Sequence, residues 1–278
     1  MTSSSTTLPA TLPGLGSRTL VMGVLNVTPD SFSDGGLFLD LPDALAHAER
    51  LEAEGADIID IGGESTRPGY VPVGPEVEQR RVLPVIRELA PKLAVPISID
   101  TYRAATARAA LEAGARIVND IWGLQHDPEM AAVVAEHGAP VVVMHNRPQA
   151  DAAIDIVADM LAFFERSLDL ARRAGIPDRN VILDPGIGFG KTGEQNIEVL
   201  RRLPELKALG FPLLVGASRK SVLGRFYAAD VPPRERLFGS IGGHVAAVAR
   251  GADIVRVHDV KAHAEACRVA DALLRNPT

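Results

Sequence analysis

The stretch E-G-A-D-I-I-D-I-G-G (Glu54–Gly63) contains the unit from which the fold can be predicted. It begins where the helical pattern Asp43–Glu54 ends, and its apolar run leads into two glycines. Glycine tolerates the left-handed backbone conformation at which many helices end, so Gly55 is predicted to separate a helix from a strand. Five similar junctions follow along the chain, in Ala113–Ile117, His137–Val141, Ala174–Asp178, Leu209–Leu213 and Arg250–Ile254.

Apolar segments of strand length alternate with helical patterns. The eight strand candidates are Leu20–Val27, Asp57–Gly63, Pro96–Asp100, Arg116–Asp120, Pro140–His145, Asn180–Gly186, Pro212–Ser218 and Ile254–Asp259. The helical patterns are Asp43–Glu54, Glu76–Ala90, Arg103–Ala113, Pro128–Glu136, Ile154–Arg173, Glu194–Ala208, Arg219–Arg250 and Ala262–Arg275. Near-continuous runs of Val, Ile and Leu indicate strands buried on both faces. Eight β-then-α units predict an α/β fold, a single-domain (β/α)8 TIM barrel over residues 18–278, with a doubly wound open sheet as the alternative.

The composition excludes several classes of protein. The chain has 278 residues, of which 46% are hydrophobic but only 4% aromatic, so Ala, Val, Leu and Ile must fill the core. Its net charge of −6, without a basic cluster, argues against nucleic-acid binding. No apolar run approaches the roughly 20 residues of a membrane span, and the single Cys267 excludes an intrachain disulfide. Residues 1–17 lack the features of a signal peptide, so we expect a disordered tail on a cytoplasmic protein.

Polar residues stand at the carboxyl ends of all eight predicted strands. They include Asn26, Asp100, Asn119, Asp120, His145, Asp184, Lys220, Arg256, His258 and Asp259, together with the segment Gly62–Gly69. One Asp or Asn in such a place commonly caps the next helix. In a barrel these ends converge on one rim, where active sites are found. Polar groups at every end therefore predict a functional site.

The residue types at this rim indicate a ligand. Two carboxylates, Asp100 and Asp184, and the amide of Asn119 can accept hydrogen bonds from a flat, nitrogen-rich heterocycle. Lys220, Arg256 and His258 supply positive charge, for which phosphate is the obvious anion. The glycine-rich segment Asp184–Thr192 lacks the spacing of a P-loop, so an NTPase is rejected.

Two residues and a group of histidines keep open or ordinary interpretations. Asn26 is either a turn residue or an oxygen ligand for Mg²⁺, an ion that keeps several waters and relies on substrate phosphates. Asp60, inside the second strand, is either a carboxylate behind the site or an ordinary hydrogen-bonded residue. Isolated histidines are expected at the surface, at positions His47, His126, His137 and His263.

Seven segments of the chain closely resemble bacterial dihydropteroate synthases. They are M-G-V-L-N-V-T-P-D-S-F-S-D-G-G, G-G-E-S-T-R-P-G, S-I-D-T, V-N-D-I, D-P-G-I-G-F-G-K-T, G-A-S-R-K-S and R-V-H-D-V, in this order from Met22 to Val260. The resemblance implies a TIM barrel, usually dimeric, that acts in the folate pathway. Such enzymes join 4-aminobenzoate to (7,8-dihydropterin-6-yl)methyl diphosphate, which gives 7,8-dihydropteroate and diphosphate.

The resemblance also implies roles for individual residues. Asp100, Asn119, Asp184 and Lys220 would hold the pterin, and Arg256 would flank its ring. Asn26 would bind Mg²⁺, while Thr66, Arg256 and His258 would bind the diphosphate. Phe32, Pro68 and Ser221 would lie near the aminobenzoate, and Asp34 and Arg67 would complete the site from two loops. No role is carried over to His145–Asp151, where the segment is short for the family.

The chemistry favours a dissociative, SN1-like substitution, because a dihydropterin methylene cation is stabilised by its ring. Three alternatives compete with a synthase. A pterin-binding methyltransferase would not need the diphosphate residues, and a non-catalytic pterin-binding paralogue would not need Asp34, Arg67, Lys220 and His258. A sugar-phosphate barrel enzyme would not need three acceptors around a flat ring.

Overall fold

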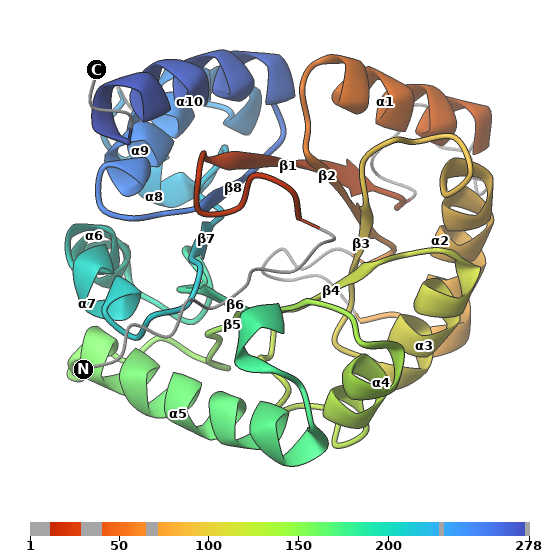
Figure 1. Cartoon of the computed structure of the whole chain (residues 1–278). Coiled ribbons are helices and arrows are strands. Elements are labelled where there is room, and N and C mark those ends of the chain that lie inside the picture. The colour runs from red at the N-terminus through yellow and green to blue at the C-terminus, as the bar shows by residue number, and fades with distance from the viewer. Residues whose placement is uncertain (1–11, 29–40, 65–71, 228–230, 276–278) are drawn as a thin grey trace.

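The computed structural model describes residues 12–28, 41–64, 72–227 and 231–275 (Figure 1). Within these ranges eight parallel strands alternate with helices, and Figure 1 shows the helices as an outer ring around the strands. The strands are β1 (Leu20–Asn26), β2 (Ile58–Gly62), β3 (Ile97–Asp100), β4 (Ile117–Asp120), β5 (Val141–Met144), β6 (Val181–Asp184), β7 (Leu214–Val215) and β8 (Ile254–Val257). The predicted (β/α)8 barrel is therefore confirmed.

The helices follow the strands in chain order. They are α1 (Leu41–Ala53), α2 (Pro75–Leu89), α3 (Ala104–Ala113), α4 (Met130–His137), α5 (Ile156–Ala174), α6 (Gly193–Arg201), α7 (Leu203–Lys207), α8 (Ser221–Gly224), α9 (Leu237–Val248) and α10 (Val260–Leu274), with short 3-10 turns at Asp178–Asn180 and Pro233–Glu235. The predicted helix Arg219–Arg250 is wrong as a single element, because α8, a 3-10 turn and α9 divide it. Pro232 and Pro233 lie at this division, and proline cannot donate an interior helical hydrogen bond.

The strand order closes the sheet into a ring. The ladder runs β6-β5-β4-β3-β2-β1-β8-β7, and β6 meets β7 through an isolated parallel bridge between Leu183 and Leu213. At this seam the Leu183 N–H donates to the Pro212 carbonyl over 2.9 Å. A doubly wound sheet would leave two free edges, so the open-sheet alternative is excluded.

The glycine junctions are confirmed by the backbone. The predicted glycines all have positive φ, at Gly55, Gly114, Gly138, Gly175, Gly210 and Gly251. At Gly114, with φ of 120°, an added Cβ would also lie 2.5 Å from the Ala90 Cβ. A residue with a side chain there would be strained and would push α2 and α3 apart.

The two faces of the strands form two separate apolar clusters. Alternate residues such as Val21, Ile59 and Val118 pack with the helices in the larger cluster. The residues between them form a smaller cluster inside the barrel, made of Leu20, Met22, Ile58, Ile117, Val142, Ile182, Leu214 and Ile254 together with Leu12 and Leu15. Side chains alternate between the faces of a strand, so both clusters follow from one apolar run. This explains why the strands look continuously hydrophobic in the sequence.

The amino-terminal segment differs from its predicted state where it can be described. Leu12 and Leu15 are 2% and 5% exposed, and they pack on the strand residues at the amino end of the barrel. The packed part of the chain therefore begins at least six residues before the predicted boundary at Arg18. The two leucines cover the smaller apolar cluster inside the barrel, which is called the floor from here on. The rest of the predicted tail, residues 1–11, lies outside the described residues.

Two further side-chain predictions have opposite outcomes. Cys267 lies in α10 and is 2% exposed, as expected for a buried small residue. His263, expected at the surface, is only 1% exposed, because its Nδ1 pairs with the Asp259 carbonyl oxygen at 2.7 Å and its ring packs on His244.

Candidate active site

The inward face of the strands changes from apolar to polar toward their carboxyl ends. Two residues after an inward apolar residue, several strands carry a polar one: Ile58 precedes Asp60, Ile117 precedes Asn119, Ile182 precedes Asp184 and Ile254 precedes Arg256. Residues two apart point to the same face of a strand. The polar side chains therefore form a layer inside the barrel, above the apolar floor.

Arg256 connects three strands of this layer. Its Nε donates to Asp60 Oδ2 over 2.6 Å, and its Nη2 donates to Asp100 Oδ2 over 2.7 Å. Asn119 Nδ2 donates to the same Asp60 oxygen over 3.1 Å. Burial disfavours the Arg256 cation, but the carboxylates of Asp60 and Asp100 outweigh this effect and raise the pKa of Arg256. The guanidinium of Arg256 is therefore charged, and two charge-assisted hydrogen bonds fix its orientation.

Asp100 lies at the upper edge of this network. Burial raises the pKa of its carboxyl to about 7, although the Arg256 charge acts in the opposite direction. In strand register Asp100 lies between Gly62 of β2 and Asn119 of β4. A Cβ added at Gly62 would contact the Asp100 carboxylate, 3.6 Å from Oδ2, so the glycine leaves this carboxylate uncovered by a β2 side chain.

Asp184 and Lys220 form the opposite side of the layer. Asp184 is 4% exposed, and its Oδ1 accepts a hydrogen bond of 2.7 Å from the Gly186 N–H. Burial raises the pKa of Asp184, while the nearby Lys220 charge acts against this rise. Lys220 Nζ donates to the Ile187 carbonyl over 2.5 Å and lies 4.7 Å from the centre of the Phe189 ring. Burial lowers the pKa of Lys220 to about 8.

His258 occupies the end of β8 beside the loop after β7. Its Nδ1 lies 3.1 Å from Ser218 Oγ, and its backbone N–H donates to the same oxygen over 3.2 Å. Burial and the Arg219 and Arg256 charges lower the pKa of His258 to about 3. In the free protein this environment disfavours the positive charge that the sequence predicts for His258. A neutral imidazole can instead donate one hydrogen bond to an anion.

The loop after β7 is held by a second ion pair. Arg219 has a φ of 60°, and its guanidinium donates to both oxygens of Asp259 over 3.0 and 2.5 Å. Its N–H donates to Ser240 Oγ over 2.8 Å. These contacts fix the chain immediately before Lys220. Ser221 then begins α8 and is exposed.

Asn26 ends β1 at the same level as Gly62 and, one strand further, Asp100. Within the described ranges no cluster of three or more His, Cys, Asp or Glu residues could hold a metal ion. The Asn26 amide oxygen is a hard ligand of the type that Mg²⁺ accepts, and Mg²⁺ commonly takes its remaining ligands from water and phosphate. The residues present therefore fit a magnesium ion that arrives with a phosphorylated substrate.

Five predicted site residues cannot be placed, and two of the polar residues at strand ends turn away from the site. Phe32, Asp34, Thr66, Arg67 and Pro68 lie outside the described residues. His145, expected at the rim, follows β5 directly and is fully buried toward the helical ring, where its Nε2 lies 3.0 Å from Asp159 of α5. Asp120 also turns away, and its two oxygens accept from the Trp122 and Leu124 N–H groups as a loop cap.

One site residue was left unassigned by the sequence. Asp60 is fully buried and holds both Arg256 and Asn119, so it is a carboxylate behind the site rather than an ordinary strand residue. Its position two residues after Ile58 was the available signal, because it shares the inward face with the apolar floor.

Comparison with known proteins identifies the relatives of this chain. The family model described as "Pterin binding enzyme" matches residues 22–258. The dihydropteroate synthase of Synechocystis sp. is 54% identical over 272 residues, which cover 95% of this chain and 93% of that protein.

Solved structures agree with this relationship. Dihydropteroate synthase from Clostridium difficile, solved in the presence of pteroic acid, has a TM-score of 0.91 at 51% identity and covers 94% of this chain and 99% of its own. The Xanthomonas albilineans dihydropteroate synthase, solved with 4-aminobenzoic acid, has a TM-score of 0.89 at 45% identity and covers 94% of each chain.

Proposed function

The chain belongs to the dihydropteroate synthases of the pterin-binding enzyme family, and on this premise we propose how its barrel rim binds the two substrates. It is a transferase of folate biosynthesis, which joins 4-aminobenzoate to (7,8-dihydropterin-6-yl)methyl diphosphate. The products are 7,8-dihydropteroate and diphosphate. The roles of single residues, the metal ion and the mechanism below are proposals.

The pairing of acceptors and a donor on the inward face is the observation that carries the proposed pterin site. Asp184, Asn119 and Asp100 offer oxygen acceptors, while Lys220 offers a donor beside the Phe189 ring. A pterin carries ring N–H and amino donors on one edge and a carbonyl acceptor beside them. We assign the donors of the pterin to the carboxylates and the amide, and its acceptors to Lys220.

Arg256 has two tasks in this proposal. Its Nε and Nη2 are held by Asp60 and Asp100, so the plane of the guanidinium is fixed beside the pterin ring. The same charge attracts the diphosphate. His258 is neutral before substrate binds, and the Ser218 hydroxyl can donate to its Nδ1. The proton then stands on Nε2, which we propose donates to a diphosphate oxygen.

The remaining diphosphate contacts come from the resemblance and from donor chemistry. Thr66 is assigned to the diphosphate, and Asn26 to a Mg²⁺ ion bound together with it. When bound, Mg²⁺ neutralises negative charge on the leaving diphosphate. Phe32, Pro68 and Ser221 are assigned to the aminobenzoate, and Asp34 and Arg67 to completing the site. Apart from Asn26, Ser221 is the one residue named in this paragraph that lies in the described part of the chain.

The chemical step that this site favours is dissociative. The bond between the pterin methylene carbon and the diphosphate oxygen breaks, and the diphosphate leaves with the electron pair. The amine nitrogen of aminobenzoate then attacks the methylene carbon and releases a proton. Asp184 and Asp100 stabilise the positive charge that develops on the ring, and Arg256 and His258 stabilise the leaving group. Orientation of the amine matters more than a strong base, because an arylamine is already nucleophilic.

Two further features complete the proposal. We propose a homodimer, because Phe226 beside α8 and Phe238 on α9 are 68% and 81% exposed, and such apolar surface commonly marks an interface. We also propose a cytoplasmic location, which rests on a single buried cysteine. Within the described ranges no helix combines the length and hydrophobicity needed to cross a bilayer.

The decisive assay follows the arylamine into product. The protein is incubated with pterin diphosphate, Mg²⁺ and labelled 4-aminobenzoate, and we expect labelled dihydropteroate with one diphosphate released per turnover. Removing Mg²⁺ with a chelator should strongly reduce the rate of dihydropteroate formation. No labelled product at any protein concentration would contradict the function.

The order of bond breaking needs a separate experiment. Pterin diphosphate with ¹⁸O in the bridging position is incubated without aminobenzoate. A dissociative step predicts that the label moves into non-bridging positions of recovered substrate, because the diphosphate rotates before it recombines. If the ¹⁸O stays in the bridging position of recovered pterin diphosphate, both without aminobenzoate and during turnover with it, the amine displaces the diphosphate directly.

A further inference from the structure

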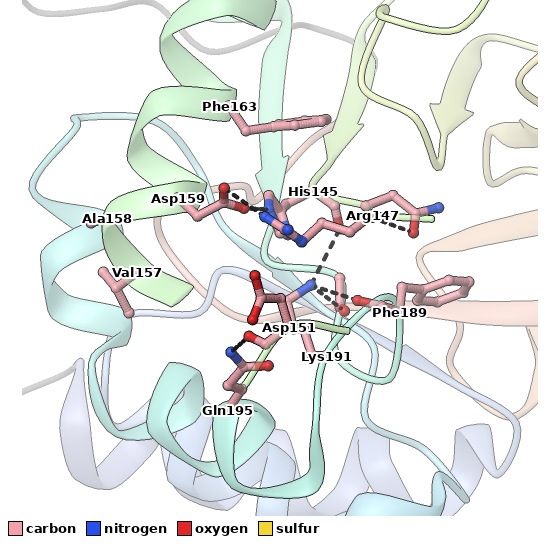
Figure 2. A network of polar contacts seen from close by, with 12 residues as sticks. His145, Arg147, Asp151, Val157, Ala158, Asp159, Phe163, Phe189, Lys191 and Gln195 are labelled. Carbon is pink, nitrogen blue, oxygen red and sulfur yellow. Dashed lines mark hydrogen bonds and ion pairs between the residues drawn. The ribbon is translucent and has the colours of Figure 1, made fainter. Parts of the chain in front are cut away.

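Lys191 is a buried cation that the mechanism above does not use. It follows the glycine-rich loop after β6 and is 9% exposed. Its Nζ donates to the carbonyl oxygens of Gly186, Phe189 and His145 over 2.9, 3.0 and 3.4 Å (Figure 2). Within the described residues no carboxylate lies within 4.0 Å of this ammonium. A buried charge held only by carbonyl groups is costly, so its presence needs a reason.

The three carbonyl groups belong to two chain segments that Lys191 joins. Gly186 and Phe189 lie in the loop after β6, whereas His145 follows β5. The two segments touch closely: a Cβ on Gly186 would lie 2.0 Å from the His145 oxygen, and one on Gly190 would lie 2.4 Å from the Arg147 oxygen. Both glycines have positive φ, at 64° and 54°. The loop therefore wraps around the ammonium in a shape that only glycine permits.

The β5 side of this contact is itself anchored to a helix. Asp159 of α5 lies 3.0 Å from His145 Nε2 and 2.7 Å from Arg147 Nη1 (Figure 2). Asp155 at the start of α5 accepts from the Val157 and Ala158 N–H groups, so this end of the helix is capped. Lys191 thus fastens the loop to a segment that is already tied to the outer helical ring.

The opposite side of the same loop forms part of the pterin site. The Gly186 N–H donates to Asp184 Oδ1, and the Ile187 carbonyl accepts from Lys220 Nζ. Gly188 lies against the Lys220 side chain, where an added Cβ would be 3.1 Å from Cδ. The Phe189 ring lies below the Lys220 ammonium. Any shift of this loop would move an acceptor and a donor of the proposed pterin site together.

We propose that Lys191 is a positioning residue for pterin recognition, which holds the loop Pro185–Gly190 on the end of β5 so that Asp184 and Lys220 keep their places. This inference rests on the pterin site proposed above. Lys191 does not touch substrate in this assignment. It acts through the backbone that presents Asp184, Ile187 and Phe189.

The charges around Lys191 support a second effect of the same residue. Burial lowers the pKa of Lys191 to about 7; Asp184 and Asp159 oppose this change, and Lys220 and Arg147 reinforce it. In turn the Lys191 charge is one of the groups that limit the rise in the pKa of Asp184, after Lys220 and the Gly186 N–H and before Arg256. Removing the Lys191 charge should therefore raise the pKa of Asp184 further.

The test compares Lys191→Met with Lys261→Met, which removes an exposed lysine of α10 as a matched control. We expect the KM for pterin diphosphate to rise about tenfold in Lys191→Met, as the loss of one or two hydrogen bonds of a positioning group implies. The KM for 4-aminobenzoate should change less than about twofold. The control should match the wild type in both. Equal changes in both KM values, or none, would overturn the proposal.

Two readouts separate positioning from general stability. The backbone amides of residues 186–190 should exchange hydrogen faster in Lys191→Met, while those of β1 and β2 should not. The acid limb of kcat/KM for pterin diphosphate should move to higher pH, because Asp184 loses a neighbouring cation. Unchanged exchange and an unmoved limb would contradict the assignment.

A milder variant covers the case in which Lys191→Met does not fold. Lys191→Gln keeps one donor group, and we expect an intermediate KM for pterin diphosphate with an unchanged KM for aminobenzoate. A Lys191→Gln enzyme with wild-type constants would overturn the inference. Wild-type protein that makes no dihydropteroate would instead contradict the function itself, so the two failures are distinguishable.

Discussion

The floor and the rim of the barrel are built from the same strands, two residues apart. On the floor Ile58, Ile117, Ile182 and Ile254 pack against each other and against Leu12 and Leu15. Two residues further along, the inward face of the same strands carries Asp60, Asn119, Asp184 and Arg256. Both levels lie on the same inward face of the same strands, so they differ in the type of side chain that each strand carries there. The floor contributes apolar burial, whereas the rim places buried charges where a ligand can pair with them.

Polar residues at the amino end of the strands have a different use. Asp57 Oδ2 accepts from the Val21 N–H, Asp253 Oδ2 from the Leu213 N–H and Asp271 Oδ2 from the Thr19 N–H, over 2.9, 2.9 and 2.7 Å. These carboxylates satisfy strand backbone groups. At the rim, by contrast, Asp60 Oδ1 is buried with no hydrogen-bond partner in the described part of the chain. The satisfied carboxylates stabilise the fold, whereas Asp60 holds Arg256 and Asn119 in the site without touching substrate.

The largest effect is expected from removing a rim cation. Lys220→Met should lower kcat/KM for pterin diphosphate about 1,000-fold, because a buried donor to the proposed pterin site is lost. Thermal stability should not fall, since burial already disfavours the Lys220 charge and lowers its pKa to about 8. Steady-state kinetics and calorimetry on the same preparations test both statements. A melting temperature that falls in proportion to the activity would mean that Lys220 also stabilises the fold, so rim and floor would not have separate roles.

The floor should show the reverse behaviour. Leu15→Ala removes a side chain that is 5% exposed and packs on the inward cluster, and it should reduce the free energy of unfolding by about 3 kcal/mol. The KM values and kcat should remain those of the wild type below the melting transition. Denaturant unfolding and kinetics at 25 °C are the measurements. A changed KM would mean that floor and rim are coupled, contrary to the separation of their contacts.

How far the sequence predicts this molecule differs between the two regions. The barrel follows from local signals, because Gly55 and its five counterparts end helices by backbone conformation and the apolar runs need no partner to be recognised. Asp100, Asn119 and Asp184 were found because they end strands. Asp60 was not assigned and His145 was misplaced, because only the inward or outward direction of a side chain separates them. That direction depends on strand register, which apolar residues on both faces conceal.

A smaller effect is expected from a carboxylate that touches no substrate. Asp60→Asn keeps an oxygen for hydrogen bonding but removes the charge that holds Arg256 Nε at 2.6 Å. We expect kcat/KM for pterin diphosphate to fall about 30-fold, comparable to removing a supporting group behind a ligand. Asp57→Asn, at the amino end, provides the matched control and should leave the kinetic constants unchanged. Equal kinetic effects of the two substitutions would contradict the role assigned to Asp60.

The smallest effect concerns pH, and it distinguishes the two regions without removing an atom from either. Burial raises the pKa of Asp100 to about 7 and lowers the pKa of Lys220 to about 8. If the pterin requires an ionised Asp100 and a protonated Lys220, kcat/KM should rise with pH through about 7 and fall above about 8, by up to tenfold per unit at each side.

The raised pKa of Asp100 also makes the stability of the substrate-free protein depend on pH. Because the folded pKa of Asp100 lies above its unfolded value, its contribution to stability is complete below about pH 4 and is lost as the pH rises through about 7. Asp100→Asn should therefore remove the part of the acid limb of kcat/KM that Asp100 causes, leave the part that Asp184 causes, and flatten the stability profile between these values. Leu15→Ala should lower stability equally at every pH and leave both limbs in place. A shift of either limb in Leu15→Ala would show that the floor contributes to the charges of the rim, because packing there would then set the burial that Asp100 and Lys220 experience.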